Sequence, residues 1–305
     1  MDISGWAAES VTRIRADGID GVRESARPVY HKALQGVASL GDPGTPIYER
    51  EWELLVVVDA CRLDLMREVA PAYEFASQVG SIRSLDSTTQ LWMRKNFSGS
   101  HSSEMAETVY VCGNPFSAEE LDTESFLALD EVWSDVWIEP GTVPPEAVTD
   151  RAIRAAREHD PERLVVHYLQ PHWPFVSRPE LVDGPERTQF GNQEWRDVWE
   201  KLRDGDLDRD EVWAGYRENL ELALDEVGVL LRNVDAETAV VTSDHGNALG
   251  EWLVYGHPPT MPHDCLRVVP WIETTATDEG TREPATHASE TAVDRQEQLA
   301  ALGYK

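Results

Sequence analysis

The sequence predicts an α/β fold in which a mostly parallel central sheet is covered by helices on both faces. Short apolar runs at 53–58, 163–169 and 238–242 have the length of buried strands. Amphipathic segments of helical length alternate with these runs. Such alternation is typical of a parallel sheet that is buried on both sides. A chain of 305 residues with 41% hydrophobic residues can bury a core of this size.

The first half of the chain contributes five predicted elements. Residues 1–45 form a helical preface, because Val11, Ile14, Ile19 and Val22 fall roughly on one face. Gly41-Asp42-Pro43-Gly44 ends this segment. The remaining elements are a strand at 53–58, helices at 61–69 and 87–97, and a strand at 108–111.

The second half adds a helix at 145–158, a strand at 163–169, a long helix at 210–232, a strand at 238–242 and a last apolar run at 266–272. A polar segment at 176–208, interrupted by Gly and Pro, is predicted to be an insertion or lid within a catalytic domain at 46–272. Residues 273–292 lack an apolar period and are predicted to be an acidic linker. Residues 293–305 would form a C-terminal docking segment.

The charge of the chain limits its partners and its environment. The formal net charge is −29, and a field of that sign repels nucleic acid and anionic lipid. Only four of the 27 basic residues are lysine. An acidic surface that is poor in lysine predicts a halophilic source, such as a halophilic archaeon, although an ordinary acidic enzyme is the alternative. Eleven tryptophans argue against disorder.

Cysteine usage and the chain start bear on the cellular location. Cys61, Cys112 and Cys265 are scattered and form no Cys-x-x-Cys pair, so they predict neither a disulfide framework nor a zinc knuckle. The residues from Met1 to Trp6 lack the basic and apolar pattern of a signal peptide. No apolar stretch reaches the ~18 residues that a membrane-spanning helix needs. We therefore expect a cytoplasmic protein without a transmembrane segment, with peripheral membrane association left open.

Acidic residues and an imidazole follow two of the predicted strands. Asp59 ends the run 54–58, and Asp244 with His245 follows the run 238–242. Ligands of open α/β sheets bind at the carboxyl ends of strands, and carboxylates and imidazoles are ligands for divalent metals. Asp59 alone is equally well explained as a helix cap. An adjacent acid and imidazole followed by Gly246 is harder to explain structurally, because a cap needs only one residue.

Further side chains are candidates for the same site. His172 lies between two prolines after the strand 163–169, and His257 follows the acid–imidazole pair in a Gly-His-Pro-Pro turn. Both are catalytic candidates, although a loop histidine is usually a surface residue. A nucleophile is expected in Ser87-Thr88-Thr89, at the start of a helix where backbone N–H groups favour an anion. Helix capping is the simpler role for these hydroxyls.

Together these segments resemble the alkaline phosphatase/sulfatase superfamily. The motifs occur in the order expected for that superfamily, from residue 54 to the C-terminus. They are Val57-Val58-Asp59-Ala60-Cys61-Arg62-Leu63-Asp64, Pro171-His172-Trp173-Pro174-Phe175, Thr242-Ser243-Asp244-His245-Gly246 with Leu249-Gly250-Glu251, and Leu299-Ala300-Ala301-Leu302-Gly303-Tyr304.

The resemblance implies a divalent metal at Asp59, Asp244 and His245, with Thr89 and His257 as further ligands. In sulfatases a formylglycine made from Cys in Cys-x-Pro-Ser-Arg lies ten residues before a closing Gly. Counting back from Gly99 reaches Thr89, which is followed by Gln90-Leu91-Trp92-Met93 instead of that motif. A Thr nucleophile is similar to the phosphodiesterase and phosphoethanolamine- or glycerophosphate-transferring branches, which also place a His where His257 stands.

We therefore expect a metal-dependent hydrolase or transferase of phosphate esters, or of sulfate esters, that uses Thr89 as nucleophile and His172 and His257 as further catalytic groups. The cofactor would be one or two ions of Zn, Mn, Mg or Ca. The partner would be a small-molecule, glycan or lipid ester, without nucleic acid. The alternative is a catalytically silent protein of the same fold with a structural or carbohydrate-binding role. A mutase-like phosphotransfer would need a second basic anion cradle, for which only Arg62, Arg83, Arg94 and Lys95 lie nearby.

Overall fold

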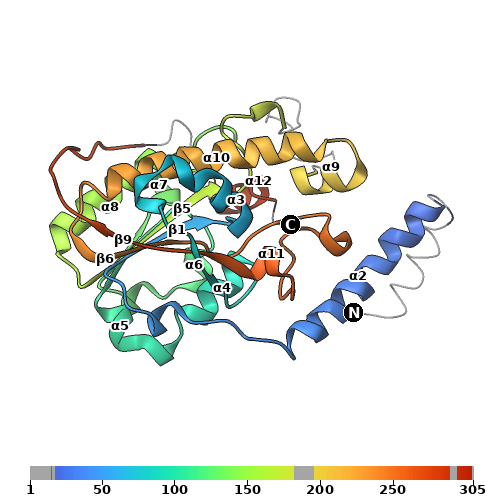
Figure 1. Ribbon diagram of the computed structural model, residues 1–305, viewed down its shortest axis with the longest axis horizontal. Coiled ribbons are helices and arrows are strands. Elements are labelled where there is room, and N and C mark those ends of the chain that lie inside the picture. The colour runs from blue at the N-terminus through green and yellow to red at the C-terminus, as the bar shows by residue number, and fades with distance from the viewer. Residues whose placement is uncertain (1–14, 16–17, 182–195, 289–293, 304–305) are drawn as a thin grey trace.

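The computed structural model describes residue 15 and residues 18–181, 196–288 and 294–303 (Figure 1). Val11 and Ile14 of the helical preface lie outside the described residues. Within the preface, helix α2 spans Ile19–Ala38. No helix in the described part of the chain is long and apolar enough to cross a membrane.

A mixed seven-stranded sheet forms the centre of the molecule, in the order β2-β9-β6-β1-β5-β3-β4. Five neighbouring strands, from β6 to β4, run parallel, and β9 runs antiparallel to β6 and β2. This confirms the predicted α/β class with a mostly parallel sheet. The strands are β1 (Leu54–Asp59), β2 (Gly80–Arg83), β3 (Thr108–Cys112), β4 (Ala128–Glu131), β5 (Arg163–Pro171), β6 (Ala236–Thr242) and β9 (Val268–Ala276).

Helices cover both faces of this sheet, as predicted (Figure 1). Side chains of β1 alternate between two cores: Leu54, Val56 and Val58 join one, and Leu55 and Val57 the other. Figure 1 shows α3, α7, α8 and α10 on one face and α4, α5 and α6 on the other. Their bounds are α3 Leu63–Val69, α4 Thr89–Asn96, α5 Ser102–Ala106, α6 Ser117–Glu120, α7 Val132–Asp135, α8 Pro145–His159 and α10 Arg209–Leu230.

Shorter elements complete the fold. Helix α10, predicted at 210–232, and the residue that follows it bury an apolar stripe of Val212, Tyr216, Leu220, Leu224, Val227 and Leu231. The other elements are α9 (Val198–Asp204), the β7–β8 hairpin (Ala248–Leu249 and Tyr255–Gly256), α11 (Asp264–Arg267) and α12 (Arg295–Ala301). In the predicted docking segment, Ala301 and Leu302 are buried, and the Gln298 side chain donates to the Trp133 carbonyl at 2.9 Å.

The last strand differs from its sequence prediction. β9 runs four residues into the segment predicted as an acidic linker, and it crosses the sheet antiparallel to β6. Its end lacks an apolar period because Glu273, Thr274 and Thr275 are not buried, whereas Ala276 is. Two edge-region strands, β2 and β4, were not predicted, because neither carries a run of buried apolar residues.

The strand register places the polar residues of the site at one edge. β1 lies between β5 and β6, and Asp59 at its carboxyl end pairs with Pro171 of β5. Val57 pairs with Thr242, the last residue of β6. Because the three strands are parallel, the residues that follow them meet at the same edge of the sheet.

Candidate active site

Asp59, Asp244 and His245 converge where β1 and β6 end, and we call these three residues the ligand cluster. One ligand atom from each lies within 4.8 Å of the others, and all three side chains are fully buried. Gly246 allows this convergence, because a Cβ at this position would lie 2.1 Å from the Cys265 carbonyl oxygen. The sequence thus brings two carboxylates and an imidazole together in the protein interior.

The hydrogen bonds of the ligand cluster leave donor atoms suited to a cation. Asp244 Oδ1 accepts from the backbone N–H groups of Ala60 and His245, both at 2.9 Å. Its other oxygen, Oδ2, is buried and has no hydrogen-bond partner among the described residues. His245 Nδ1 donates to the Gly246 carbonyl at 2.9 Å, which leaves the Nε2 lone pair 3.4 Å from Asp244 Oδ2. These donors fit a divalent metal ion.

The charges of the two buried carboxylates also favour a divalent cation at the ligand cluster. Burial, followed by the charge of Asp244, raises the pKa of Asp59 well above its ordinary value. Two carboxylates this deep in the protein are costly to ionise together unless a cation is present. A bound divalent ion would remove that cost and hold both carboxylates in their charged form.

Thr89 is the hydroxyl that faces the ligand cluster. Its Oγ1 lies 3.4 Å from both carboxylate oxygens of Asp59 and 3.2 Å from His245 Nε2. The side chain is buried at the first residue of α4. Of the three predicted candidates, Thr89 is therefore the one in contact with the ligand cluster.

The two neighbouring hydroxyls have other partners. Thr88 is the N-cap of α4 and accepts from the Leu91 N–H at 3.4 Å. Ser87 Oγ donates to the Pro258 carbonyl at 2.6 Å and accepts from the Met261 N–H at 3.0 Å. Ser87 thereby ties the segment that carries Thr89 to the turn that carries His257.

His172 and His257 lie next to each other and are called the histidine pair. Their Nε2 atoms are 3.1 Å apart, and the His257 ring stacks on His245 with centroids 4.5 Å apart. Burial lowers the pKa of His172 to about 4 and that of His257 well below its usual value. Both imidazoles are thus neutral at pH 7. His263 does not join them, and its ring packs instead on Trp252 with centroids 4.4 Å apart.

Sequence reasoning missed two residues that contact Asp59. Asn114 Nδ2 donates to Asp59 Oδ2 at 2.6 Å, and His167 Nε2 lies 3.7 Å from the same oxygen. The hydroxyl of Tyr110 forms a hydrogen bond with His167 Nδ1 at 2.8 Å. Asn114 could have been found, because it follows strand β3 as Asp59 ends β1. His167 gave a weaker signal, a lone imidazole inside an otherwise apolar strand.

Comparisons with known proteins bear on the fold. No protein-family model and no curated protein sequence matches the chain. Solved structures do match. The soluble domain of lipooligosaccharide phosphoethanolamine transferase A from Neisseria meningitidis has a TM-score of 0.52 at 14% identity, over 81% of each chain. The integral membrane protein of the same name has a TM-score of 0.53 at 14% identity, over 81% of this chain and 50% of that one.

The chain has the alkaline phosphatase/sulfatase fold. This confirms the resemblance drawn from the ordered motifs. A third match of this fold is the C-terminal periplasmic domain of phosphoethanolamine transferase EptC from Campylobacter jejuni, with a TM-score of 0.47 at 15% identity, over 73% of this chain and 78% of that one.

The expected cytoplasmic location is contradicted by these neighbours. The two with TM-scores above 0.5 are the soluble domain of a phosphoethanolamine transferase and the integral membrane protein of the same name, so the likeness is to a membrane-anchored protein and not to a cytoplasmic one. The prediction relied on the lack of a leader or membrane-spanning pattern, and such a lack does not locate a domain.

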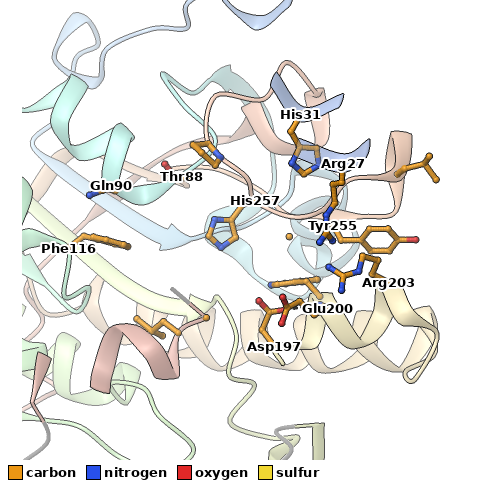
Figure 2. A pocket seen from close by; sticks show the side chains of 16 residues that line it. Arg27, His31, Thr88, Gln90, Phe116, Asp197, Glu200, Arg203, Tyr255 and His257 are labelled. Atoms are coloured by element: carbon orange, nitrogen blue, oxygen red, sulfur yellow. Dashed lines mark hydrogen bonds between the residues drawn. The ribbon is translucent and has the colours of Figure 1, made fainter. Parts of the chain in front are cut away.

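In this sulfatase-like fold, a pocket of about 380 Å³ opens beside the site. Figure 2 shows His257 near its middle, with Thr88 and Gln90 on one side and Arg27 and Arg203 on the other. The pocket therefore offers a route from solvent to the helix start that carries Thr89.

The four basic residues that were the nearby candidates for a second anion cradle are already paired with acids. Their partners are Asp64 and Glu251 for Arg62, Asp264 for Arg83, Glu120 for Arg94 and Asp86 for Lys95. Arg62 Nη1 also donates a hydrogen bond to the Asn247 carbonyl at 2.8 Å. This pairing gives the mutase-like alternative no support.

Proposed function

We propose that the chain is a metal-dependent enzyme that transfers or hydrolyses phosphate esters through a nucleophilic Thr89. The observation that carries the proposal is the position of Thr89 Oγ1, which lies within 3.4 Å of both Asp59 oxygens and 3.2 Å from His245. A buried threonine beside two carboxylates and an imidazole has no obvious structural purpose. It has the arrangement of an activated nucleophile.

Asp59, Asp244 and His245 would hold the metal, and His257, stacked on His245, is the candidate for a further ligand. A divalent ion bound there supplies charge that lowers the pKa of a neighbouring hydroxyl and polarises an ester oxygen. Zinc would suit the imidazole, whereas manganese, magnesium or calcium would suit the carboxylates. The ligand cluster does not select among them.

The side chains divide the remaining chemistry between them. Thr89 Oγ1 attacks phosphorus in line, so that a new O–P bond forms while the bond to the leaving oxygen breaks. Because His245 Nε2 would bind the metal, the Asp59 carboxylate, 3.4 Å away, is the nearest acceptor for the hydroxyl proton. The phosphoryl group then leaves Thr89 Oγ1 for the oxygen of water in a hydrolase, or for the oxygen of an acceptor alcohol in a transferase.

The histidine pair is placed to act on the substrate's oxygens. His172 Nδ1 donates to the Trp173 carbonyl, which leaves its Nε2 to accept from His257. A phosphoryl oxygen or leaving oxygen that took the place of His172 Nε2 as the acceptor would therefore receive the Nε2–H group of His257. Asn219 supports this arrangement, because its Nδ2 donates to the His172 carbonyl at 3.0 Å.

Phosphate is favoured over sulfate by the nucleophile segment. Thr89 cannot become the formylglycine of sulfatases, and the residues after it, Gln90-Leu91-Trp92-Met93, lack Pro-Ser-Arg. The two similar solved structures with TM-scores above 0.5 carry the name phosphoethanolamine transferase, and their likeness to this chain is one of fold.

A catalytically silent protein is the alternative, and the altered nucleophile segment motivates it. The convergence of Asp59, Thr89, Asp244 and His245 argues against it, since a protein without turnover has no need to keep all four in contact.

The proposal is tested by metal analysis of the purified protein together with turnover of a phosphomonoester, a phosphodiester and a sulfate ester. We expect bound divalent metal and turnover of at least one phosphate ester that a chelator abolishes and added metal restores. A protein that binds no divalent metal, or that turns over none of the esters with metal bound, would contradict it.

A further inference from the structure

Helix α2 has an apolar face that points away from the rest of the molecule. Val29 and Val37 of α2 are 48% and 57% exposed, and Leu40, the second residue after the helix, is 88% exposed. At 100° per residue, six of the exposed apolar positions in and just after α2 fall within an arc of about 80°, and exposed Pro28 and Tyr30 lie outside it. We call this set the outer stripe, and it consists of Val22, Ala26, Val29, Ala33, Val37 and Leu40.

The opposite face of α2 attaches the helix to the protein. Leu34 is buried with Val254, Met261 and Leu266. Tyr30 donates its hydroxyl to the Trp252 carbonyl at 2.9 Å, and Gln35 Nε2 donates to the Pro259 carbonyl at 3.0 Å. Figure 1 shows α2 at the edge of the molecule, away from the central sheet. The outer stripe is therefore a surface that the core of this chain does not use.

A second exposed apolar feature lies beside α2. Trp252 and Leu253 are 63% and 75% exposed at the tip of a turn. Both have a left-handed backbone, with φ of 51° and 60°, which is unfavourable for residues other than glycine. The turn thus holds a large aromatic and a large aliphatic side chain in solvent, in a segment that Tyr30 fixes to the helix.

The charge of α2 indicates what covers these groups. In a chain of net charge −29, the segment 19–38 has three basic and two acidic residues, a net charge of +1. A second copy of this acidic chain would be repelled. An apolar helix face with basic residues on the helix and an exposed tryptophan nearby is typical of helices that lie in a membrane interface.

We propose that the outer stripe and the Trp252–Leu253 turn dock on the surface of a phospholipid bilayer. The apolar side chains would enter the headgroup region, and Lys32, which is exposed on α2, would meet lipid phosphates. The net charge of the whole chain opposes binding to anionic membranes, so burial of the apolar groups provides the driving force.

Docking in this orientation has a consequence for the pocket beside the site. Arg27 and His31 of α2 and Leu253 of the turn all line the pocket that contains His257 (Figure 2). That consequence is limited to the turn: Leu253 would bring one wall of the pocket to the lipid surface, whereas Arg27 and His31 lie about 120° and 160° around α2 from the middle of the outer stripe. Membrane docking itself does not depend on the proposed chemistry.

The test is flotation of the full chain with phosphatidylcholine vesicles, with and without phosphatidylglycerol. We compare the natural protein with Val37→Glu, and with Leu127→Glu as a matched control, since Leu127 is 48% exposed beside edge strand β4. We expect the natural protein and the control to float with both vesicles, more weakly when phosphatidylglycerol is present. Val37→Glu should reduce the partition on the order of tenfold.

Three results would overturn the proposal. The first is a natural protein that does not float with either vesicle. The second is an equal partition of Val37→Glu and the natural protein. The third is self-association without lipid that Val37→Glu abolishes, which would identify a second copy as the occupant.

Discussion

The ligand cluster and the histidine pair form two halves of one site and are built differently. Asp59 and Asp244 stand at or directly after the ends of central strands, so the sheet fixes their positions. His172 and His257 lie in loops and are placed by contacts with each other and with Trp173 and His245. Strand ends thus supply charge and rigidity, whereas loops supply neutral imidazoles.

The difference in charge suggests different duties. The ligand cluster contains two carboxylates and a buried oxygen of Asp244 that has no hydrogen-bond partner among the described residues. The histidine pair is neutral, because burial lowers the pKa of both imidazoles. We therefore expect changes in the ligand cluster to remove metal and turnover together, and changes in the histidine pair to affect turnover first.

Asp244→Asn should have the largest effect. It removes a charged ligand, so metal content should fall, and turnover should fall by about a thousandfold or more, since the metal supplies several kcal/mol of barrier reduction. Metal analysis and steady-state rates check this. Asp206→Asn, at an exposed carboxylate outside the site, is the control and should change neither. Full turnover by Asp244→Asn would exclude this residue as a ligand.

Thr89→Ala should abolish covalent turnover while metal stays bound, because it removes the nucleophile and leaves both carboxylates and His245 in place. Thr88→Ala is the matched control one residue away. It removes the α4 cap and should cost about 1 kcal/mol of folding free energy without loss of turnover. If Thr88→Ala inactivates the enzyme and Thr89→Ala does not, the nucleophile is misassigned.

His257→Asn should lower turnover by roughly 10²–10⁴-fold, the usual contribution of one acid–base group. Metal content should fall less than in Asp244→Asn if His257 serves the substrate more than the metal. A loss of metal equal to that of Asp244→Asn would place His257 in the ligand cluster and erase the distinction between the two halves. Rates and metal content of the two variants, measured side by side, decide this.

The smallest effect concerns stability against pH. The pKa of His172 falls from 6.5 to about 4 on folding, so the unfolded chain binds this proton first. The free energy of unfolding of the metal-free protein should therefore decrease as the pH falls from about 6.5 towards 4, by roughly 2–3 kcal/mol from this residue. Denaturant titrations of His172→Asn should show a shallower decrease. The exposed His159→Asn should match the natural protein.

The sequence predicted the parts of the molecule that follow from local patterns. The apolar runs of β1 and β6 are fully buried at their centres, and this pattern located Asp59, Asp244 and His245 at one edge. The long helix predicted at 210–232 agrees with α10 within two residues at each end. These features depend on side chains that are close in sequence, and so the sequence alone reveals them.

Other features depend on tertiary contacts that no local pattern encodes. The antiparallel direction of β9 is set by its neighbours β6 and β2. The choice of Thr89 over Ser87 required the contacts of Ser87 with Pro258 and Met261, which lie more than 170 positions away in the chain. The outer stripe of α2 also depended on the structure, because only exposure distinguishes an outward apolar face from a packed one.

The most direct test of the account is to trap the covalent intermediate. Metal-loaded protein is mixed with a phosphate ester that it turns over, quenched with acid during turnover, digested and analysed by tandem mass spectrometry. We expect the transferred group on Thr89 in the natural protein, and an unmodified Thr89 peptide in Asp244→Asn. The transferred group on another residue, or rapid turnover with Thr89 unmodified at every time point, would contradict it.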